Sequence, residues 1–325
     1  MFELVEIPVT SLANVRIGQA EDTAAATGCT VLLCPAGAAA GLDVRGGGPA
    51  SRESELLRPT AAADRIHAVL LSGGSAFGLD AAGGVMRWLE ERGIGFDTGA
   101  ARVPLVCASC LYDLTVGSST VRPGPEMGYA ACENAGNYRD GCHGAGTGAS
   151  VGKFRGMGQA MKTGIGSYAV RLGRLEVGAV VALNALGDVF DWRTGREAAG
   201  MLTPGRDGFL STEGEMYRSG KVVKNKFVGN TTIGAVVTNA RFDKTAMNKI
   251  AAMAQNGMVR AIRPVNTTAD GDSLYALSVG DVEADLDLVG TLAAQVVAEA
   301  ILRAADSAAG GYGLPARRDL PWAQD

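Results

Sequence analysis

The stretch Gly229-Asn230-Thr231-Thr232-Ile233-Gly234-Ala235-Val236-Val237-Thr238 joins a Gly-Asn turn to an apolar run that is typical of a buried β-strand. Thr231 therefore lies where a turn meets a strand. If the chain cleaves itself before Thr231, that threonine gains a free α-amino group, whose ordinary pKa of about 7.7–8.0 lets it accept the hydroxyl proton. The alternative is a turn residue that only opens a strand.

The composition indicates a large folded core and a small ligand. The chain has 325 residues, of which 47% are hydrophobic, enough for one large layered domain or two smaller ones. Its net charge of −4 comes without a basic stripe, which argues against nucleic acid and anionic membranes as partners. Residues 1–7 lack the basic region and the long apolar core that are typical of a signal peptide, and no stretch of 18 uncharged apolar residues occurs. We therefore expect a soluble, cytoplasmic protein with a small neutral or amine-bearing ligand.

Cysteine and histidine usage restricts the possible chemistry. All six cysteines precede Thr231, so no disulfide can join the two fragments. Cys107-Ala108-Ser109-Cys110 has redox or zinc spacing, but apolar flanks and the lack of a second such pair favour buried free thiols. Only His67 and His143 are present, which leaves little material for Ser-His-Asp catalysis or a polyhistidine metal site. We expect neither a metal nor a cofactor.

Short apolar segments alternate with amphipathic stretches, a pattern typical of a compact α/β fold. Buried strands are predicted at 30–34, 67–71, 177–183 and 274–278. Helices are predicted through Leu79 to Leu89, from Asp243 to about Arg260 and from about Asp285 to Ala305. The inner faces of the last two are predicted to carry Met247, Ile250, Ala251, Ala254 and Met258, and Leu288, Leu292, Val296 and Ala300. Glycine, proline and charge dominate 194–229, which predicts a mobile surface connection upstream of Thr231.

Two glycine-rich motifs resemble known loops without matching them. In Gly144 to Lys153, the phosphate-loop spacing fails because Thr147 stands where glycine is needed and Phe154 follows the lysine. A glycine-lined substrate or oxyanion wall, or a plain tight loop, fits better. Ser72 to Gly78 carries Phe77 where a nucleophile elbow needs glycine, which predicts a close-packed strand-to-helix turn.

Asp270-Gly271-Asp272 places two carboxylates on a turn that enters a strand. Either the turn is solvated, or one acid orients the Thr231 amine or a lysine while the other meets the substrate. A second Asn-Thr-Thr at 266–268 is a rival cleavage site, but it runs into this acidic turn rather than into a buried strand. We favour cleavage between Asn230 and Thr231, which yields fragments of 230 and 95 residues.

Several stretches in one order resemble the self-processing N-terminal-nucleophile peptidases. That family includes the L-aminopeptidase/D-alanine esterase-amidase, the β-peptidyl aminopeptidases and the nylon-oligomer (6-aminohexanoate) hydrolases. The matching stretches are Gly41 to Gly47, Ser72 to Asp80, Gly144 to Lys153, Leu183 to Asp188, Gly229 to Thr238 and Asp270 to Asp272. The resemblance implies one αββα domain over 1–325, cut into an α chain (1–230) and a β chain (231–325) that stay associated and assemble into oligomers.

The resemblance also implies residue roles. Thr231 resembles the nucleophile, Asn184 the amide that faces the oxyanion, Lys153 a polar partner of the nucleophile, Asp270 and Asp272 its acidic pair, and Tyr112 a tyrosine near the oxyanion. The aminopeptidase members use a serine nucleophile and a Ser-Gly-Glu type turn. Thr231 and the Asp-Gly-Asp turn are similar to the nylon-oligomer hydrolases instead.

We therefore expect a self-processing threonine amidohydrolase that cleaves small amides, peptides or oligoamides, such as 6-aminohexanoate oligomers, through an acyl-enzyme on Thr231. Four alternatives stay open: a β-peptidyl or D/L-aminopeptidase, an acyltransferase of the ornithine acetyltransferase type, a pantetheine-type amidase and a glycine-rich nucleotide-binding module.

Overall fold

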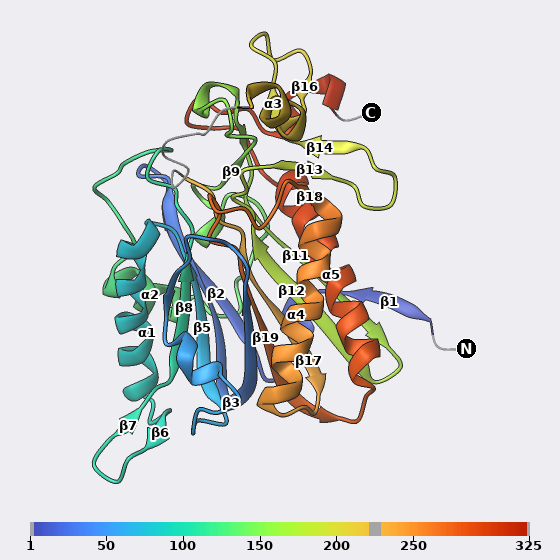
Figure 1. Ribbon diagram of the computed structural model, residues 1–325. Coiled ribbons are helices and arrows are strands. Elements are labelled where there is room, and N and C mark those ends of the chain that lie inside the picture. The colour runs from blue at the N-terminus through green and yellow to red at the C-terminus, as the bar shows by residue number, and fades with distance from the viewer. Residues whose placement is uncertain (1–2, 221–228, 324–325) are drawn as a thin grey trace.

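The longest strand, β3 (Thr27–Val44), connects the two halves of the molecule. The computed structural model describes residues 3–220 and 229–323. The first part of β3 pairs with β2 (Arg16–Asp22) and β5 (Ile66–Ser72), and its last six residues pair with β19 (Ser273–Val282). The register of β3 shifts between these two parts. One ten-stranded sheet is thereby divided into two half-sheets (Figure 1).

The strands of the two half-sheets come from distant parts of the sequence. The first half-sheet has the order β1 (Leu4–Ile7), β11 (Ile165–Leu172), β12 (Leu175–Ala182), β17 (Ile233–Ala240), β19 and β3. The second continues from β3 through β5 and β8 (Val106–Cys110) to β4 (Ala50–Arg52), with β2 on β3. The pairs β17–β19 and β5–β8 are parallel, and the other pairs of this sheet are antiparallel.

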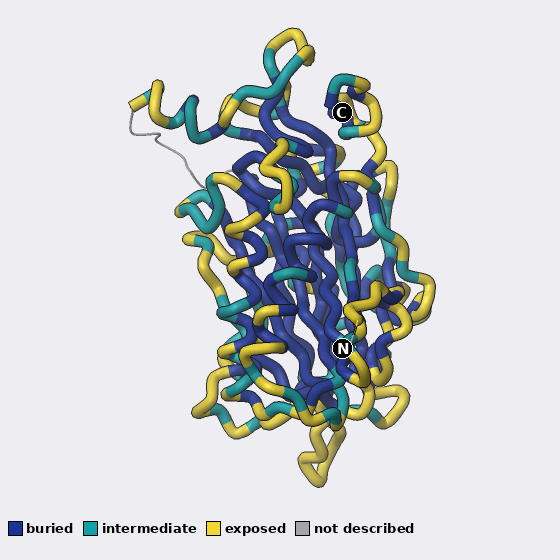
Figure 2. Tube along the Cα trace, turned by 90° about the vertical axis from the view of Figure 1, so that its right-hand side faces the viewer, coloured by how far each residue is buried: buried dark blue, intermediate teal, exposed yellow. Residues whose placement is uncertain are grey.

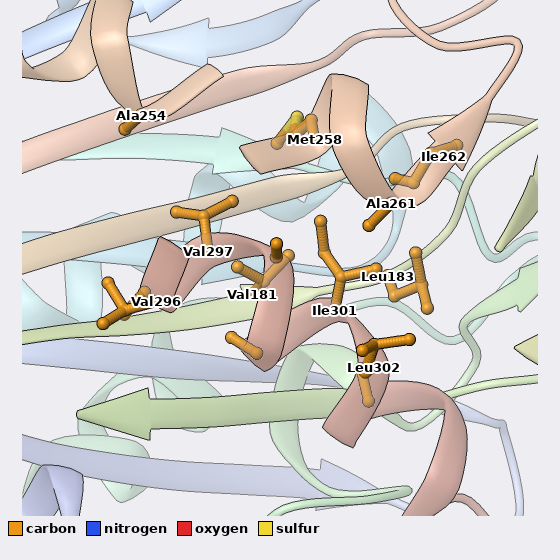
Figure 3. Packing of buried hydrophobic residues seen from close by; sticks show 14 of the residues in the cluster. Val181, Leu183, Ala254, Met258, Ala261, Ile262, Val296, Val297, Ile301 and Leu302 are labelled. Atoms are coloured by element: carbon orange, nitrogen blue, oxygen red, sulfur yellow. The ribbon is translucent and has the colours of Figure 1, made fainter. Parts of the chain in front are cut away.

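Two helix pairs cover the outer faces. Helices α4 (Lys244–Ala261) and α5 (Leu286–Asp306) pack on the first half-sheet, and α1 (Ala81–Glu90) and α2 (Pro125–Glu133) pack on the second (Figure 1). In Figure 3, Val297 and Ile301 of α5 gather with Val181 of β12 and Met258 of α4. A further buried cluster joins residues of both half-sheets. The αββα architecture expected from the sequence is thereby confirmed.

The central strands are apolar on both faces because both faces are buried. In β12, Val177, Ala179 and Val181 belong to the cluster under α4 and α5, whereas Val180 and Ala182 belong to the cluster between the half-sheets. Alternate residues of a strand point to opposite faces, so two buried faces require a continuous apolar run. Figure 2 shows this buried interior. All four buried strands predicted from the sequence are confirmed.

The predicted helices are also confirmed. The Asp243 side chain accepts a hydrogen bond from Ala246 N, and that of Asp285 accepts one from Leu288 N. The prediction that Leu288 faces the core is wrong: it is 39% exposed, because it lies in the first turn before the buried Val289. Helix α5 is long and apolar enough to cross a membrane, yet 78% of its most apolar window is buried inside the protein.

The predicted irregular connection at 194–229 is wrong over much of its length. It contains β14 (Glu197–Ala199), β15 (Met201–Leu202), β16 (Phe209–Leu210) and α3 (Thr212–Ser219). The buried Asp188 carboxylate accepts hydrogen bonds from the backbone N and the hydroxyl of Thr212, both at 2.7 Å, and fastens the start of α3. Residues 221–228 lie outside the described residues.

The remaining elements are short. The strands are β6 (Phe96–Asp97), β7 (Arg102–Val103), β9 (Ser150–Val151), β10 (Met161–Lys162), β13 (Asp188–Phe190) and β18 (Ile262–Arg263). The 3₁₀ helices are Val9–Ser11, Ser54–Leu57, Ser75–Asp80, Gly144–Gly146, Met157–Gln159, Arg317–Asp319 and Pro321–Ala323. All six cysteines are free, and Cys107 and Cys110 are buried, as predicted for that pair.

The contact between α1 and α2 gives a test with adjacent glycines. A Cβ atom on Gly84 would lie 1.7 Å from the Pro125 carbonyl oxygen, whereas a Cβ on Gly83 would lie 4.0 Å from its nearest neighbour. Gly84→Ala should destabilise the protein by about 1–3 kcal/mol because the helices must separate. Gly83→Ala should stabilise it by about 0.5–1 kcal/mol through helix propensity. Denaturant titration measures both, and equal effects would contradict this account.

Candidate active site

Thr231 lies immediately before β17, buried with 4% of its surface exposed. Its backbone N donates a hydrogen bond to the Asn184 carbonyl oxygen (2.8 Å), and Gly271 N donates to the Asn230 carbonyl oxygen (3.1 Å). The Thr231 hydroxyl also donates to the Asn230 carbonyl oxygen. The hydroxyl therefore lies beside the carbonyl group of the peptide bond that joins Asn230 to Thr231.

The turn before Asn230 is held in an unusual conformation. Gly229 has a φ of +99°, which residues with side chains rarely adopt. Its carbonyl oxygen accepts hydrogen bonds from Lys153 Nζ (2.5 Å) and from Asn184 Nδ2 (3.3 Å). Two of the side chains singled out in the sequence thus hold the chain next to Thr231.

Asn184 follows the end of β12 and is fully buried. Its Oδ1 accepts hydrogen bonds from Lys153 Nζ (2.8 Å) and Ser150 N (3.1 Å). Its Nδ2 donates to the carbonyl oxygens of Tyr112 (2.9 Å) and Gly229 (3.3 Å). Because the oxygen faces two donors and the nitrogen faces two acceptors, the orientation of this amide is fixed.

Lys153 brings a titratable amine to the same place. Its Nζ donates to the Asn184 carbonyl oxygen (3.1 Å), which also accepts from Thr231 N. Burial lowers the pKa of Lys153 to about 7, against the opposing charges of Asp270 and Asp272. An amine that titrates near neutrality can accept and return a proton during catalysis.

The two aspartates support the segments around Thr231. Both are buried, so the solvated-turn alternative is wrong. Asp272 accepts hydrogen bonds from Thr232 N (2.7 Å) and Asn266 N (3.0 Å). Asp270 accepts from Leu186 N (3.3 Å) and from Thr267. Burial and the like charge of Asp270 raise the pKa of Asp272.

The two Asn-Thr sequences have different environments. The Thr267 hydroxyl donates to Asp270 Oδ2 (2.5 Å), so it stabilises the acidic turn. The Thr231 hydroxyl instead contacts the carbonyl group that precedes it. The geometry therefore favours the first copy as the reactive one.

The six predicted site residues lie together in the structure, but they make different kinds of contact. Lys153, Asn184 and Thr231 are in direct hydrogen-bonded contact, and the aspartates reach them through backbone N–H groups. Tyr112 contributes its carbonyl oxygen, and its ring lies 3.6 Å from where a Gly229 Cβ would be. Ser150 and Gly271 were missed by sequence reasoning because they act through backbone N–H groups, which every residue except proline carries.

Comparisons with known proteins show the family and the fold of this chain. Residues 8–314 match Peptidase family S58. An uncharacterized aminopeptidase of Mycobacterium leprae (strain TN) is 37% identical over 272 residues, 80% of this chain and 72% of the relative. A 6-aminohexanoate-oligomer endohydrolase of Kocuria sp. (strain KY2) is 31% identical over 335 residues, 94% and 89% of the two chains. The L-aminopeptidase D-Ala-esterase/amidase of Ochrobactrum anthropi, a variant of the Ntn hydrolase fold, superposes with a TM-score of 0.68 at 16% identity, covering 94% and 88%.

The fold and these matches define an enzyme that hydrolyses amide or peptide bonds on an Ntn-hydrolase scaffold. The chain belongs to peptidase family S58. The family resemblance predicted from the sequence is confirmed, and the hydrolase is favoured over the nucleotide-binding alternative.

The acidic turn gives a test of stability. Asp272→Asn replaces one acceptor oxygen with an amide that faces a backbone N–H, so it should destabilise the protein by about 1–3 kcal/mol. Asp281→Asn, at the exposed far end of β19, should change stability by less than about 0.5 kcal/mol. Denaturant midpoints compare the two variants. Equal midpoints would show that the Asp272 contacts do not stabilise the site.

Proposed function

We propose that this enzyme cleaves its own chain between Asn230 and Thr231 and then uses Thr231 as an N-terminal nucleophile on small amides. One observation carries the proposal: the buried Thr231 hydroxyl contacts the carbonyl of that peptide bond, in a turn held by Lys153 and Asn184. The Gly229 conformation contributes to the same arrangement.

Self-cleavage proceeds through an ester. Thr231 Oγ1 attacks the Asn230 carbonyl carbon, its proton passes to Lys153, and the C–N bond breaks as Thr231 N takes up a proton. Water then hydrolyses the ester, giving an Asn230 carboxylate and a free Thr231 amine and hydroxyl. The Gly271 N–H, 3.1 Å from the Asn230 oxygen, stabilises the negative charge that develops there.

Substrate hydrolysis repeats the same chemistry on an external amide. The Thr231 amine accepts the hydroxyl proton, the oxygen attacks the substrate carbonyl, and the amine of the substrate leaves with a proton. Asn184 Nδ2 stabilises the oxyanion, and water releases the acyl group from Thr231. Asp272 holds the backbone after the nucleophile through Thr232 N, and Asp270 holds the segment after Asn184 through Leu186 N.

The substrate class proposed is small linear amides and oligoamides, with 6-aminohexanoate oligomers tested first. Thr231 and the Asp-Gly-Asp turn support this choice, as does similarity over most of the chain to an enzyme named for those oligomers. Aminopeptidase activity is the second candidate, because a 37% identical relative carries that name. A panel of oligoamides, β-peptides and aminoacyl anilides, with water and amine acceptors compared, separates the candidates and tests acyl transfer.

We further propose that the enzyme works in the cytoplasm as α and β chains assembled into a homo-oligomer. The six free thiols support a reducing compartment. The family resemblance supports the assembly. Light scattering of the purified enzyme measures its mass, and a monomeric αβ pair would contradict the assembly.

Intact-mass measurement tests the cleavage site. Wild-type protein should yield fragments of 230 and 95 residues, and Thr231→Ala should stay whole because it lacks the attacking oxygen. Thr267→Ala is the matched control and should still cleave before Thr231. A wild-type chain that stays whole under native conditions would contradict the proposal, and cleavage before Thr267 would move the site.

The pH dependence of self-cleavage tests Lys153. Since burial lowers its pKa to about 7, the amine is neutral above that pH and protonated below it. Precursor recovered from inclusion bodies and refolded at pH 6 to 8.5 should therefore cleave faster as the pH rises through about 7. Lys153→Arg stays protonated, so its rate should be about 10²-fold lower and flat over this range. A flat wild-type profile would remove Lys153 as the base.

A further inference from the structure

The side-chain amide nitrogen of Asn184 donates hydrogen bonds to two backbone carbonyl oxygens, and the proposed cleavage leaves only one of these acceptors in place. Nδ2 donates to the carbonyl oxygens of Gly229 (3.3 Å) and Tyr112 (2.9 Å). Under the proposed function, on which this inference rests, Gly229 lies next to the new chain end and makes way for substrate. The Tyr112 carbonyl then sets the direction of Nδ2 in the mature enzyme.

The Tyr112 carbonyl lies beyond the end of β8, so its neighbours must fix it. On its N-terminal side, Leu111 N donates to the Ser72 carbonyl oxygen (2.8 Å). The Leu111 carbonyl oxygen accepts from Ser75 N (2.9 Å). These bonds fasten one side of Tyr112 to the turn after β5.

Asp113 fastens the other side of Tyr112. Its Oδ1 accepts from Gly74 N (2.7 Å), and its Oδ2 accepts from the Thr27 hydroxyl (2.7 Å). Gly74 has a φ of +80° and Ser75 one of +54°, so the turn includes a non-glycine residue in the left-handed region. Such a conformation persists only where surrounding contacts determine it.

The surroundings of Asp113 leave its carboxylate no freedom to move. Asp113 is 2% exposed. A Cβ on Gly73 would lie 2.0 Å from its Oδ2, and a Cβ on Gly148 would lie 2.6 Å from its Cβ. The carboxylate therefore fits between glycine segments that have no side chains at these points.

We propose that Asp113 is a positioning residue for amide hydrolysis. Through the hydrogen bonds to Gly74 and Thr27, it holds the Tyr112 carbonyl in place, and that carbonyl aims Asn184 Nδ2 at the oxyanion. Asp113 itself does not touch the reacting atoms.

The first experiment measures kcat and KM per active site, titrated with an acylating inhibitor. Asp113→Ala and Thr27→Val should lower kcat by about 10-fold or more, with KM changed by less than about 3-fold, because Asn184 acts on the transition state. Asp113→Asn should keep kcat within about 3-fold of wild type. Its carbonyl still accepts from Gly74 N, and its amide donates to the Thr27 oxygen.

The matched control is Thr238→Val, which removes another buried threonine hydroxyl, at the far end of β17. It should lower stability without lowering kcat. If Asp113→Ala does not fold, Thr27→Val and Asp113→Asn still decide the question.

Selective ¹⁵N-asparagine labelling gives a second measurement. The Asn184 side-chain resonance should move in Thr27→Val and keep its wild-type position in Asp113→Asn and Thr238→Val. A full kcat or an unmoved Asn184 resonance in Thr27→Val would overturn this inference alone. A wild-type chain that neither cleaves nor turns over substrate would overturn the proposed function as well.

Discussion

The parallel pairing of β17 with β19 is the constraint on which the site depends. Parallel strands begin at the same edge of a sheet, so the segments that precede them lie side by side. Ile233 pairs with Ser273, and three residues earlier Asn230 bridges Asp270. The antiparallel β12 ends at the same edge, where Ala182 pairs with Ile233 and Asn184 reaches Thr231. A slip of one residue would turn every side chain to the opposite face and separate these groups.

Three buried side chains that can carry charge, Lys153, Asp270 and Asp272, lie close together in the site. Burying an unpaired charge costs several kcal/mol, so each charged group needs hydrogen-bond partners. Lys153 Nζ contacts three oxygens, and both aspartates accept backbone N–H groups. These partners fix the charges in position, and the same burial brings the pKa of Lys153 to about 7. Burial thus requires the hydrogen-bond partners that hold the lysine in place, and it also lowers the pKa of Lys153.

The sequence predicted the strands and helices that have a periodic signal, and it placed Thr231, Asn184, Lys153 and the aspartates in one site through family resemblance. The short elements between 197 and 219 were missed. Helix α3 is stabilised by Asp188, which lies in a distant segment, and the local composition does not indicate that contact. The N–H groups of Ser150 and Gly271 were missed for a related reason. A backbone donor is defined by where the chain runs, and only the assembled sheet determines that path.

The proposed self-cleavage and the hydrolysis of substrate make different demands on these same groups. In the intact chain, Lys153 Nζ and Asn184 Nδ2 both donate hydrogen bonds to the Gly229 carbonyl oxygen. The two donors are therefore unavailable to an external amide. Under the proposed cleavage, Gly229 and Asn230 become a free chain end that can withdraw, and both donors are released together with the Thr231 amine. The segment that blocks the site in the intact chain therefore ends at the bond that the proposed cleavage breaks. Under this proposal, the enzyme has no activity on other amides before its own chain has folded, because the Thr231 hydroxyl and the Asn184 amide meet only when β12 and β17 are paired.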